Sequence, residues 1–291
     1  MSYQDATQQA VIEAPTQVGK IGRVLLESGR LTEQQAEKVL LRQQERKIRF
    51  GEAAIELGYI SEADIQFALA RQFSYAYLQP GDGLVSEQVV AAYYPYTPYV
   101  ERLRSLRSQL NQNWIQKGRK ALVLVSDEAG SGCTELAANL AVVFAQLGER
   151  TLLIDADLRD SQQHLLFKLS NRQGLTDILA DRADIGCIHK INRLPGLSVL
   201  TSGTPAPNPQ ELLASPHFKL LLDELEQRFD VIIIDSPALE GCVDAQVIAA
   251  PVQGVVMVAN QHETKAKALQ DAVSLVRNTG AQVLGCVLNQ Q

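Results

Sequence analysis

The stretch from Ala121 to Glu135, ALVLVSDEAGSGCTE, constrains the fold more than any other part of the sequence. Five apolar residues precede Ser126 and predict a buried strand, while the spacing of LAANLAVVFAQL after Glu135 predicts a helix packed on a sheet. A glycine-rich turn between them leads into the helix at Thr134. This order of strand, turn and helix is typical of a phosphate-binding loop, where backbone N–H groups and a helix N-terminus hold phosphate oxygens.

The turn departs from the phosphate-binding motif GxxxxGK[ST] at one position. In that motif the lysine neutralises phosphate charge and the following hydroxyl holds Mg²⁺. Gly130, Gly132 and Thr134 stand in the places of the glycines and the hydroxyl residue, with Ser131 between the glycines, but Cys133 occupies the lysine position. The turn therefore keeps the small residues of a phosphate site and lacks its cation.

Three carboxylates lie beside this turn, those of Asp127, Glu128 and Glu135. Like charges at close range repel a triphosphate unless a cation lies between them. From the turn alone, an incidental glycine-rich connection and a nucleotide site are equally good interpretations.

Length and composition favour two domains in a protein of acidic character. The 291 residues, 46% hydrophobic and 21% charged, are enough for at least one full core. A formal net charge of −6 argues against nucleic acid as a partner. The first residues, MSYQDATQQ, lack the basic and apolar regions of a signal peptide, and no apolar run approaches the roughly 18 residues of a membrane span. We therefore expect a cytoplasmic protein that reaches a membrane only through a partner.

An internal repeat follows a polar stretch, residues 1–17, that we expect to be disordered. Residues 20–43 read KIGRVLLESGRLTEQQAEKVLLRQ, and residues 49–72 read RFGEAAIELGYISEADIQFALARQ, at an offset of 29 positions. Each copy predicts a short helix ended by a glycine, then a capping signal and a longer amphipathic helix. Residues 18–75 are thus predicted to form a small all-α domain.

This repeat resembles the N-terminal domain of type II secretion and pilus-assembly ATPases, in the branch that binds cyclic di-GMP. The resemblance implies that basic residues offer charge and a stacking plane to the ligand while glycine turns bring backbone N–H groups near its phosphates. Lys20 for arginine, and Ile21 and Phe50 for leucine, depart from the family pattern. A helical docking module without a ligand is the alternative. The candidate ligand residues are Lys20, Ile21, Gly22, Gln43, Arg49, Phe50, Gly51 and Gln72.

Residues 76–100 are predicted to be a linker, because prolines and glycines interrupt them. The segment ERLRSLRSQL follows and predicts a basic amphipathic helix in which Glu101, Arg104 and Arg107 share one face. A solvated surface stripe and an intersubunit contact are both open interpretations of that face.

Acidic residues end two further predicted strands. TLLIDADLR delivers Asp155 and Asp157 at the end of one strand, and DVIIIDSP ends in Asp235. Carboxylates at the C-terminal ends of parallel strands lie at the crevice where α/β sheets bind ligands, and such groups hold Mg²⁺ or position an attacking hydroxyl. Two such strand ends after a glycine-rich loop favour the nucleotide site, with Thr134, Asp155 and Asp235 as the metal-side residues.

Strand and helix patterns alternate through the remainder, which predicts an α/β fold: a P-loop NTPase-like, mainly parallel sheet with helices on both faces. Residues 101–291 resemble the cytoplasmic domain of bacterial tyrosine kinases of exopolysaccharide synthesis, relatives of the partitioning ATPases. LLIDADLR and DVIIIDSP match that family's second Walker motif and Walker B, and the segment from Pro207 to Leu213 matches PNPxELL.

The resemblance implies Mg²⁺ and ATP or ADP as cofactors, Asp155 and Asp157 as catalytic residues, and Asn289 as a base contact. It also implies oligomer contacts through ExxRxxR, here Glu101, Arg104 and Arg107, and a membrane chain-length-determinant co-polymerase as the partner. With the repeat domain added, the chain resembles the chain-length-determinant type of tyrosine kinase, peripherally associated with the inner membrane.

Three hypotheses about activity follow from these observations. The first is an enzyme of the tyrosine-kinase lineage whose phosphotransfer is impaired because Cys133 replaces the lysine. The second is a pseudokinase, an inactive assembly or regulatory module that responds to cyclic di-GMP. The third is a weak partitioning-type ATPase. Such an ATPase is expected to have a signature lysine, and Glu128 stands at that position here. The missing cation favours the second hypothesis, and the retained carboxylates favour the first.

Overall fold

The computed structural model describes residues 19–72 and 76–290, without the side chains of residues 70–72. The chain forms two compact units, with the boundary between Ala76 and Tyr77. The predicted disordered tail, residues 1–17, lies outside the described residues. Within them, no helix is both long enough and apolar enough to cross a bilayer.

Within residues 19–72 of the first unit, the chain forms four helices in two pairs, as the repeat predicts. Both short helices stop two residues before a glycine with positive φ, 70° at Gly29 and 69° at Gly58, because such a residue closes a helix without strain. Thr32 forms a capping box with Gln35 at the start of the second helix. The four helices are α1 (Lys20–Glu27), α2 (Glu33–Arg46), α3 (Phe50–Glu56) and α4 (Glu62–Gln72).

Small residues hold the helices of this unit together around Leu25 and Val39, which are fully buried. A Cβ atom at Gly51 would lie 2.7 Å from Cδ1 of Ile65, so this glycine permits α3 to approach α4. Gly22 lies inside α1 and Gly51 lies inside α3. The glycine turns that the resemblance implies near the ligand phosphates are therefore not formed at these two positions. The glycines that do form turns are the ones after the helices.

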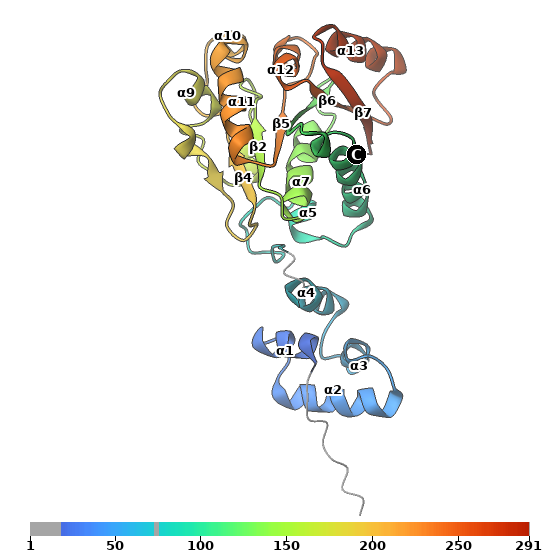
Figure 1. The fold of residues 1–291 in the computed structure, drawn as a ribbon. Coiled ribbons are helices and arrows are strands. Elements are labelled where there is room, and N and C mark those ends of the chain that lie inside the picture. The colour runs from blue at the N-terminus through green and yellow to red at the C-terminus, as the bar shows by residue number, and fades with distance from the viewer. Residues whose placement is uncertain (1–18, 73–75, 291) are drawn as a thin grey trace, which may run out of the picture. The chain divides into compact units, whose positions relative to one another are not determined.

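The second unit is built on a seven-stranded sheet in the order β3-β4-β2-β5-β1-β6-β7 (Figure 1). All neighbouring strands are parallel except β3 and β4, so the predicted mainly parallel α/β fold is confirmed. The strands are β1 (Ala121–Ser126), β2 (Thr151–Asp155), β3 (His189–Lys190), β4 (Leu197–Leu200), β5 (Val231–Asp235), β6 (Gly254–Asn260) and β7 (Gln282–Asn289).

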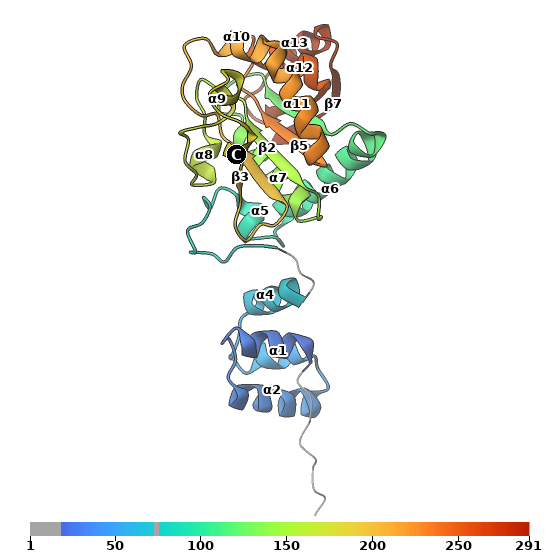
Figure 2. The ribbon, with the colours of Figure 1, turned by 60° about the vertical axis from the view of Figure 1, so that its left-hand side comes forward.

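Alternate residues of the central strands face two separate cores, one on each side of the sheet. Helices lie on both sides of the sheet (Figure 2). One face packs against α5 (Val90–Tyr93), α6 (Pro98–Asn113), α7 (Cys133–Ala145) and α8 (Gln163–Leu166). The other packs against α9 (Leu175–Leu179), α10 (Pro209–Ala214), α11 (Pro216–Arg228), α12 (Asp244–Val252) and α13 (Ala266–Asn278). Two short 3₁₀ helices complete the unit, η1 (Ile115–Lys117) and η2 (Ile185–Cys187).

Proline placement divides one region of helical sequence into two helices. The pattern from Pro209 to Arg228 predicts a single helix, but α10 ends at Ala214 and α11 begins at Pro216. Ser215 between them is extended, with φ −67° and ψ 151°, because a residue before proline is forced out of the helical region.

Most of the expected linker, residues 76–100, belongs to the second unit from Tyr77 onward, and Leu78 and Tyr93 are buried in the core that α7 shares. The buried Asn139 side chain accepts a hydrogen bond from the N–H of Ala91 at 2.8 Å and donates one to the carbonyl of Gln88 at 3.0 Å. Tyr93 is 3% exposed, and its hydroxyl donates to the carbonyl of Val85 at 2.7 Å. The part of this segment around Gln88 and Ala91 is therefore fixed to α7 by hydrogen bonds.

Candidate functional site

The loop between β1 and α7 has the backbone of a phosphate cradle. Gly130 and Gly132 have φ angles of 79° and 77°, a conformation that glycine adopts without strain. Helix α7 begins at Cys133, one residue before the position that the sequence predicts, and its N-cap is Gly132, so no side chain caps it. The first N–H groups of a helix have no partner within the helix and carry its positive dipole end. This end of α7 can therefore accept an anion.

Two buried carboxylates lie beside the cradle at the ends of neighbouring strands. Asp155 ends β2, Asp235 ends β5, and the two residues are register partners in the sheet. They are 0% and 1% exposed. In the described part of the chain, the Oδ1 atom of each finds no hydrogen-bond partner. A buried unpaired carboxylate oxygen is costly, and a bound cation or a proton satisfies it.

The electrostatics of this pair agree with that interpretation. Burial raises the pKa of Asp155 well above its usual value, and the charge of Asp235 raises it further. Burial likewise raises the pKa of Asp235 to about 7, although hydrogen bonds from Gln163 and Thr134 oppose the shift. The pair therefore takes up a proton readily unless a metal ion supplies the positive charge.

Gln163 connects the parts of the site, and the sequence analysis missed it. Its side chain is fully buried, and its Nε2 donates to Oδ2 of Asp235 at 2.8 Å and to the carbonyl of Thr134 at 3.0 Å. Its backbone N–H donates to Oδ2 of Asp155 at 2.9 Å. No sequence signal marks this residue, because a glutamine at the start of the short helix α8 resembles any exposed polar residue.

Cys133 provides no substitute for a cation. Its side chain is 7% exposed, and burial together with the charges of Asp235 and Asp157 raises the pKa of the thiol well above its usual value. The thiol thus stays neutral at the position where the motif has an ammonium group. The cradle keeps its backbone shape without a positive side chain at this position.

The three carboxylates that flank the loop in the sequence, those of Asp127, Glu128 and Glu135, have different surroundings in the structure. Burial and the neighbouring charges of Glu128 and Glu240 raise the pKa of Asp127. Glu135 is different, because its carboxylate accepts a hydrogen bond from Nε2 of Gln88 at 2.8 Å. Glu128 also accepts a hydrogen bond, from the hydroxyl of Thr264 at 3.4 Å.

The remaining residues of the second Walker-like segment are held by local contacts. Oδ1 of Asp157 accepts hydrogen bonds from the N–H groups of Arg159 at 3.0 Å and Asp160 at 2.9 Å. Nε of Arg159 lies 2.7 Å from Oδ2 of Asp244, which is 1% exposed. Asp157 is half-buried and lies two residues beyond Asp155, near enough for its charge to affect both Asp235 and Cys133.

Asn289 lies at the end of β7 and contacts the cradle. Its Nδ2 donates to the carbonyl of Ser131 at 3.0 Å. Ser131 is 3% exposed, and its hydroxyl has no hydrogen-bond partner among the described residues. Asn289 thus supports the loop from the side, and its role as a base contact stays a prediction.

The three charged residues of ExxRxxR lie on α6 and contact their own chain. Arg104 forms an ion pair with Glu101, and Nη1 of Arg107 donates to the carbonyl of Val143 at 2.7 Å. Glu101 has a side chain that is 62% exposed. Their role in an oligomer contact stays a prediction.

The donor set at the end of the sheet fits Mg²⁺. This ion is bound in proteins by one or two carboxylates, while water and substrate phosphates complete its octahedron. Asp155, Asp235 and the Thr134 hydroxyl would hold it. Across residues 19–72 and 76–290 there is no cluster of three or more histidine, cysteine or acidic side chains able to hold a metal ion by themselves.

The candidate ligand residues of the first unit fall at equivalent places in the two repeats. Lys20 is the first residue of α1 and Arg49 is the N-cap of α3, and both are exposed. Ile21 and Phe50 follow them and pack partly against the core of this unit. Gln43 lies on α2 and is half-buried. The side chain of Gln72 lies outside the described residues.

The fold and the site together define a nucleoside-triphosphatase-type domain with a phosphate loop, and residues 119–282 match the family model of the AAA domain. The chain belongs to the family of bacterial tyrosine-protein kinases. It is 36% identical over 196 residues to the putative tyrosine-protein kinase CapB of Staphylococcus aureus, covering 67% of this chain and 86% of that protein.

The chain also resembles solved structures, among them a tyrosine kinase domain and a chimerical protein. The kinase domain of the Escherichia coli tyrosine kinase ETK is 30% identical, with a TM-score of 0.67, and the match covers 69% of this chain and 79% of that domain. The chimerical protein CapA2B2 is 31% identical, with a TM-score of 0.65 and coverage of 76% and 96%. These matches confirm the sequence-based assignment to the tyrosine-kinase family.

Proposed function

We propose that this protein binds Mg²⁺ and ATP or ADP in the cradle of Gly130 to Thr134 and transfers phosphate weakly. The observation that carries the proposal is the buried pair Asp155 and Asp235, whose unpartnered oxygens lie at the strand ends beside a neutral Cys133. Bound Mg·ATP would supply the phosphoryl group and most of the positive charge at this site. The carboxylates have no other counter-charge in the described part of the chain that could explain their burial.

Different residues of the site would bind the phosphates, bind the metal and position the attacking group. The N–H groups at the start of α7 would hold phosphate oxygens, while Thr134, Asp155 and Asp235 would hold the metal. Asp155 and Asp157 would orient an attacking tyrosine hydroxyl, and Gln163 would keep Asp235 in place. The site lacks the ammonium that stabilises developing charge, and the loss of one such electrostatic contact costs about 10²-fold or more in rate.

The biological role that we propose is regulation of exopolysaccharide chain length or export. It rests on the tyrosine-kinase family and on the resemblance of the whole domain order to the chain-length-determinant type. In this role the protein is cytoplasmic, associates with the inner membrane through a co-polymerase partner, and forms a homo-oligomer through Glu101, Arg104 and Arg107. The negative charge of the chain agrees with a partner other than nucleic acid.

Nucleotide binding and phosphotransfer need to be measured separately. We expect calorimetry of the full chain to give binding of ADP that weakens at least tenfold when Mg²⁺ is removed or when Asp155 is changed to Asn. We expect incorporation of labelled γ-phosphate into tyrosine to be slow or absent in the same preparation. An affinity for ADP that changes neither on removal of Mg²⁺ nor in Asp155→Asn would refute the proposed site. Rapid phosphotransfer would refute the proposed impairment of activity.

A second candidate function is a regulatory module that responds to cyclic di-GMP through the first unit. It is favoured by the equivalent, exposed positions of Lys20 and Arg49 in the two repeats. Titration of the full chain with cyclic di-GMP is expected to show binding that Arg49→Ala removes and that Arg46→Ala, a change of an exposed arginine at the end of α2, leaves intact. Absence of binding at high micromolar ligand would leave only the helical docking interpretation for this unit.

A further inference from the structure

A cavity of about 770 Å³ opens in the second unit at a place that the nucleotide chemistry does not use. Arg150 immediately precedes β2, Leu197 begins β4, and Phe229 lies two residues before β5, and all three line the cavity. It therefore lies at the N-terminal ends of these parallel strands, whereas Asp155 and Asp235 lie at their C-terminal ends. The five residues of β2 separate the two sites by about 13 Å or more of strand.

The walls of this cavity are mainly apolar. Ile188, Leu197 and Phe229 contribute to them, together with a turn that contains Pro195 and Gly196. Its volume falls within the range of ligand pockets, which are about 300–1,000 Å³ and lined mainly by apolar side chains with a few polar groups. The walls therefore suit an apolar chain of a small molecule.

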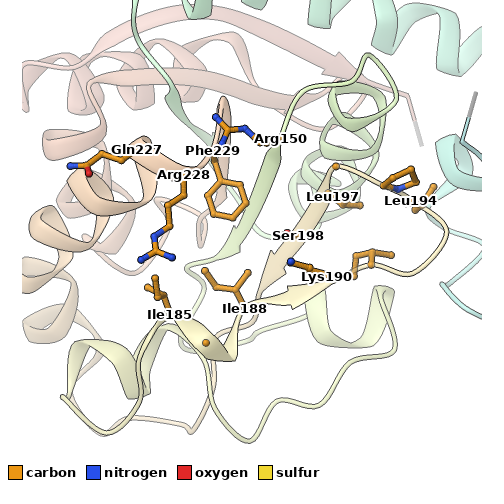
Figure 3. A pocket seen from close by; sticks show the side chains of 14 residues that line it. Arg150, Ile185, Ile188, Lys190, Leu194, Leu197, Ser198, Gln227, Arg228 and Phe229 are labelled. Atoms are coloured by element: carbon orange, nitrogen blue, oxygen red, sulfur yellow. The ribbon is translucent and has the colours of Figure 1, made fainter.

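Every charged side chain that lines the cavity is positive, although the whole protein carries a net charge of −6. These side chains are Arg150, Lys190 and Arg228. Figure 3 shows the head groups of Arg228 and Lys190 on opposite sides of the space, with Phe229 and Ile188 between them. Cations placed around an apolar cavity in an acidic protein indicate a ligand with an anionic group.

Two of the three cations already have a carboxylate partner, and the third does not. Arg150 pairs with Asp230 at 2.6 Å, and Arg228 pairs with Glu224 at 3.0 Å. Lys190 has no carboxylate within 4 Å in the described part of the chain and is exposed on the short edge strand β3. One uncompensated positive charge thus stands at the rim and matches a single anionic head group.

We propose that this cavity binds an anionic single-chain amphiphile, with its apolar chain against Ile188, Leu197 and Phe229 and its head group at Lys190. The apolar walls supply the affinity, because burial of the chain removes its CH₂ groups from water. The lysine supplies the preference for a negative head. A lipid phosphate and a fatty acid share this chemistry, and the head group distinguishes them in the experiment.

The test uses the full chain and probes held below their micelle concentrations. Dodecyl phosphate and dodecanoate carry the chain and a negative head, dodecyl maltoside carries the same chain with a neutral head, and inorganic phosphate carries the charge alone. We expect calorimetry to show binding of at least one of the two anionic amphiphiles, at least tenfold tighter than that of the other two probes. The tighter of the two anionic probes assigns the head group.

Two charge-reversal variants distinguish binding in the cavity from nonspecific attraction of the amphiphile to surface charge. Lys190→Glu is expected to weaken binding of the preferred amphiphile at least tenfold, whereas Arg277→Glu, on α13 and outside the cavity, is expected to leave it within twofold. The fluorescence of the single tryptophan, Trp114, checks that both variants are folded. Equal binding of dodecyl maltoside, no effect of Lys190→Glu, or displacement by Mg·ADP would each overturn the proposal.

Discussion

The replacement of Asp235 by Asn tests whether the buried negative charge of this site destabilises the protein in the absence of a ligand. The carboxylate of Asp235 is 1% exposed, lies beside Asp155, and has one oxygen with no partner among the described residues. Asn has nearly the same shape, can still accept the hydrogen bond from Gln163, and removes one negative charge. We therefore expect Asp235→Asn to stabilise the ligand-free protein at neutral and alkaline pH.

The size of this effect follows from the pKa of Asp235, which burial raises from 3.8 to about 7. The folded state binds the proton more tightly than the unfolded chain, so stability falls as pH rises between these two values. Proton linkage for this one group gives a loss on the order of 2 kcal/mol in the free energy of unfolding from about pH 5 to pH 8. Asp155, whose pKa is raised as well, adds to the loss in the same direction.

Urea unfolding followed by tryptophan fluorescence measures this loss in the relevant unit. Trp114 is the one tryptophan of the chain, is 4% exposed, and belongs to the second unit. The free energy of unfolding of the natural chain is expected to fall between pH 5 and pH 8, and that of Asp235→Asn to fall by less, because only the contribution of Asp155 remains. The variant is expected to be the more stable protein at pH 8.

Asp230→Asn is the matched control, because Asp230 precedes the other end of the same strand. A hydrogen bond from Arg150 lowers the pKa of Asp230 to about 2. The stability from this exposed pair, about 1 kcal/mol or less, is present above pH ~3.8 and is lost only as pH falls toward 2. Asp230→Asn should therefore leave the slope between pH 5 and pH 8 unchanged. An unchanged slope in Asp235→Asn would refute the reasoning.

Two further predictions concern packing and assembly. Gly254→Ala places a Cβ atom 2.4 Å from Cζ2 of Trp114, whose Nε1 is held by the carbonyl of Ala121 at 2.8 Å, so circular dichroism in urea should show a loss of about 1–3 kcal/mol. Gly285→Ala in β7, with no atom within 4 Å, should change stability by about 0.5 kcal/mol or less. Glu101→Arg should lower the sedimentation coefficient of a homo-oligomer, and an unchanged value would remove α6 from the interface.

Local sequence patterns were sufficient to predict the helical repeat and the parallel arrangement of the strands that carry the site. The glycines after α1 and α3 and the capping box of Thr32 follow from short-range chemistry, so the helical repeat could be read directly. Asp155 and Asp235 each end an apolar run, and parallel strands bring such ends together at one edge of a sheet. The position of the carboxylate pair therefore followed from the predicted topology.

Other features depend on contacts between distant residues and left no pattern in the sequence. Gln163 acts through hydrogen bonds to Thr134 and Asp235, which are 29 and 72 residues away. Residues 77–100 contain turn-forming residues, yet Gln88 and Ala91 within them are hydrogen-bonded to the buried amide of Asn139 on α7. The cavity at Lys190 gathers residues from four segments, and no one of these segments is unusual by itself.

The affinity for Mg·ATP of the natural chain, Cys133→Lys and Cys133→Ala tests the central claim most directly. A hydrogen bond to a charged group contributes about 1.5–3 kcal/mol, so Cys133→Lys should bind about 10–100 times more tightly than the natural chain, and its phosphotransfer to tyrosine should rise. Cys133→Ala should bind like the natural chain, because both side chains are neutral. Tight binding with rapid phosphotransfer in the natural chain, and no gain in Cys133→Lys, would contradict the account.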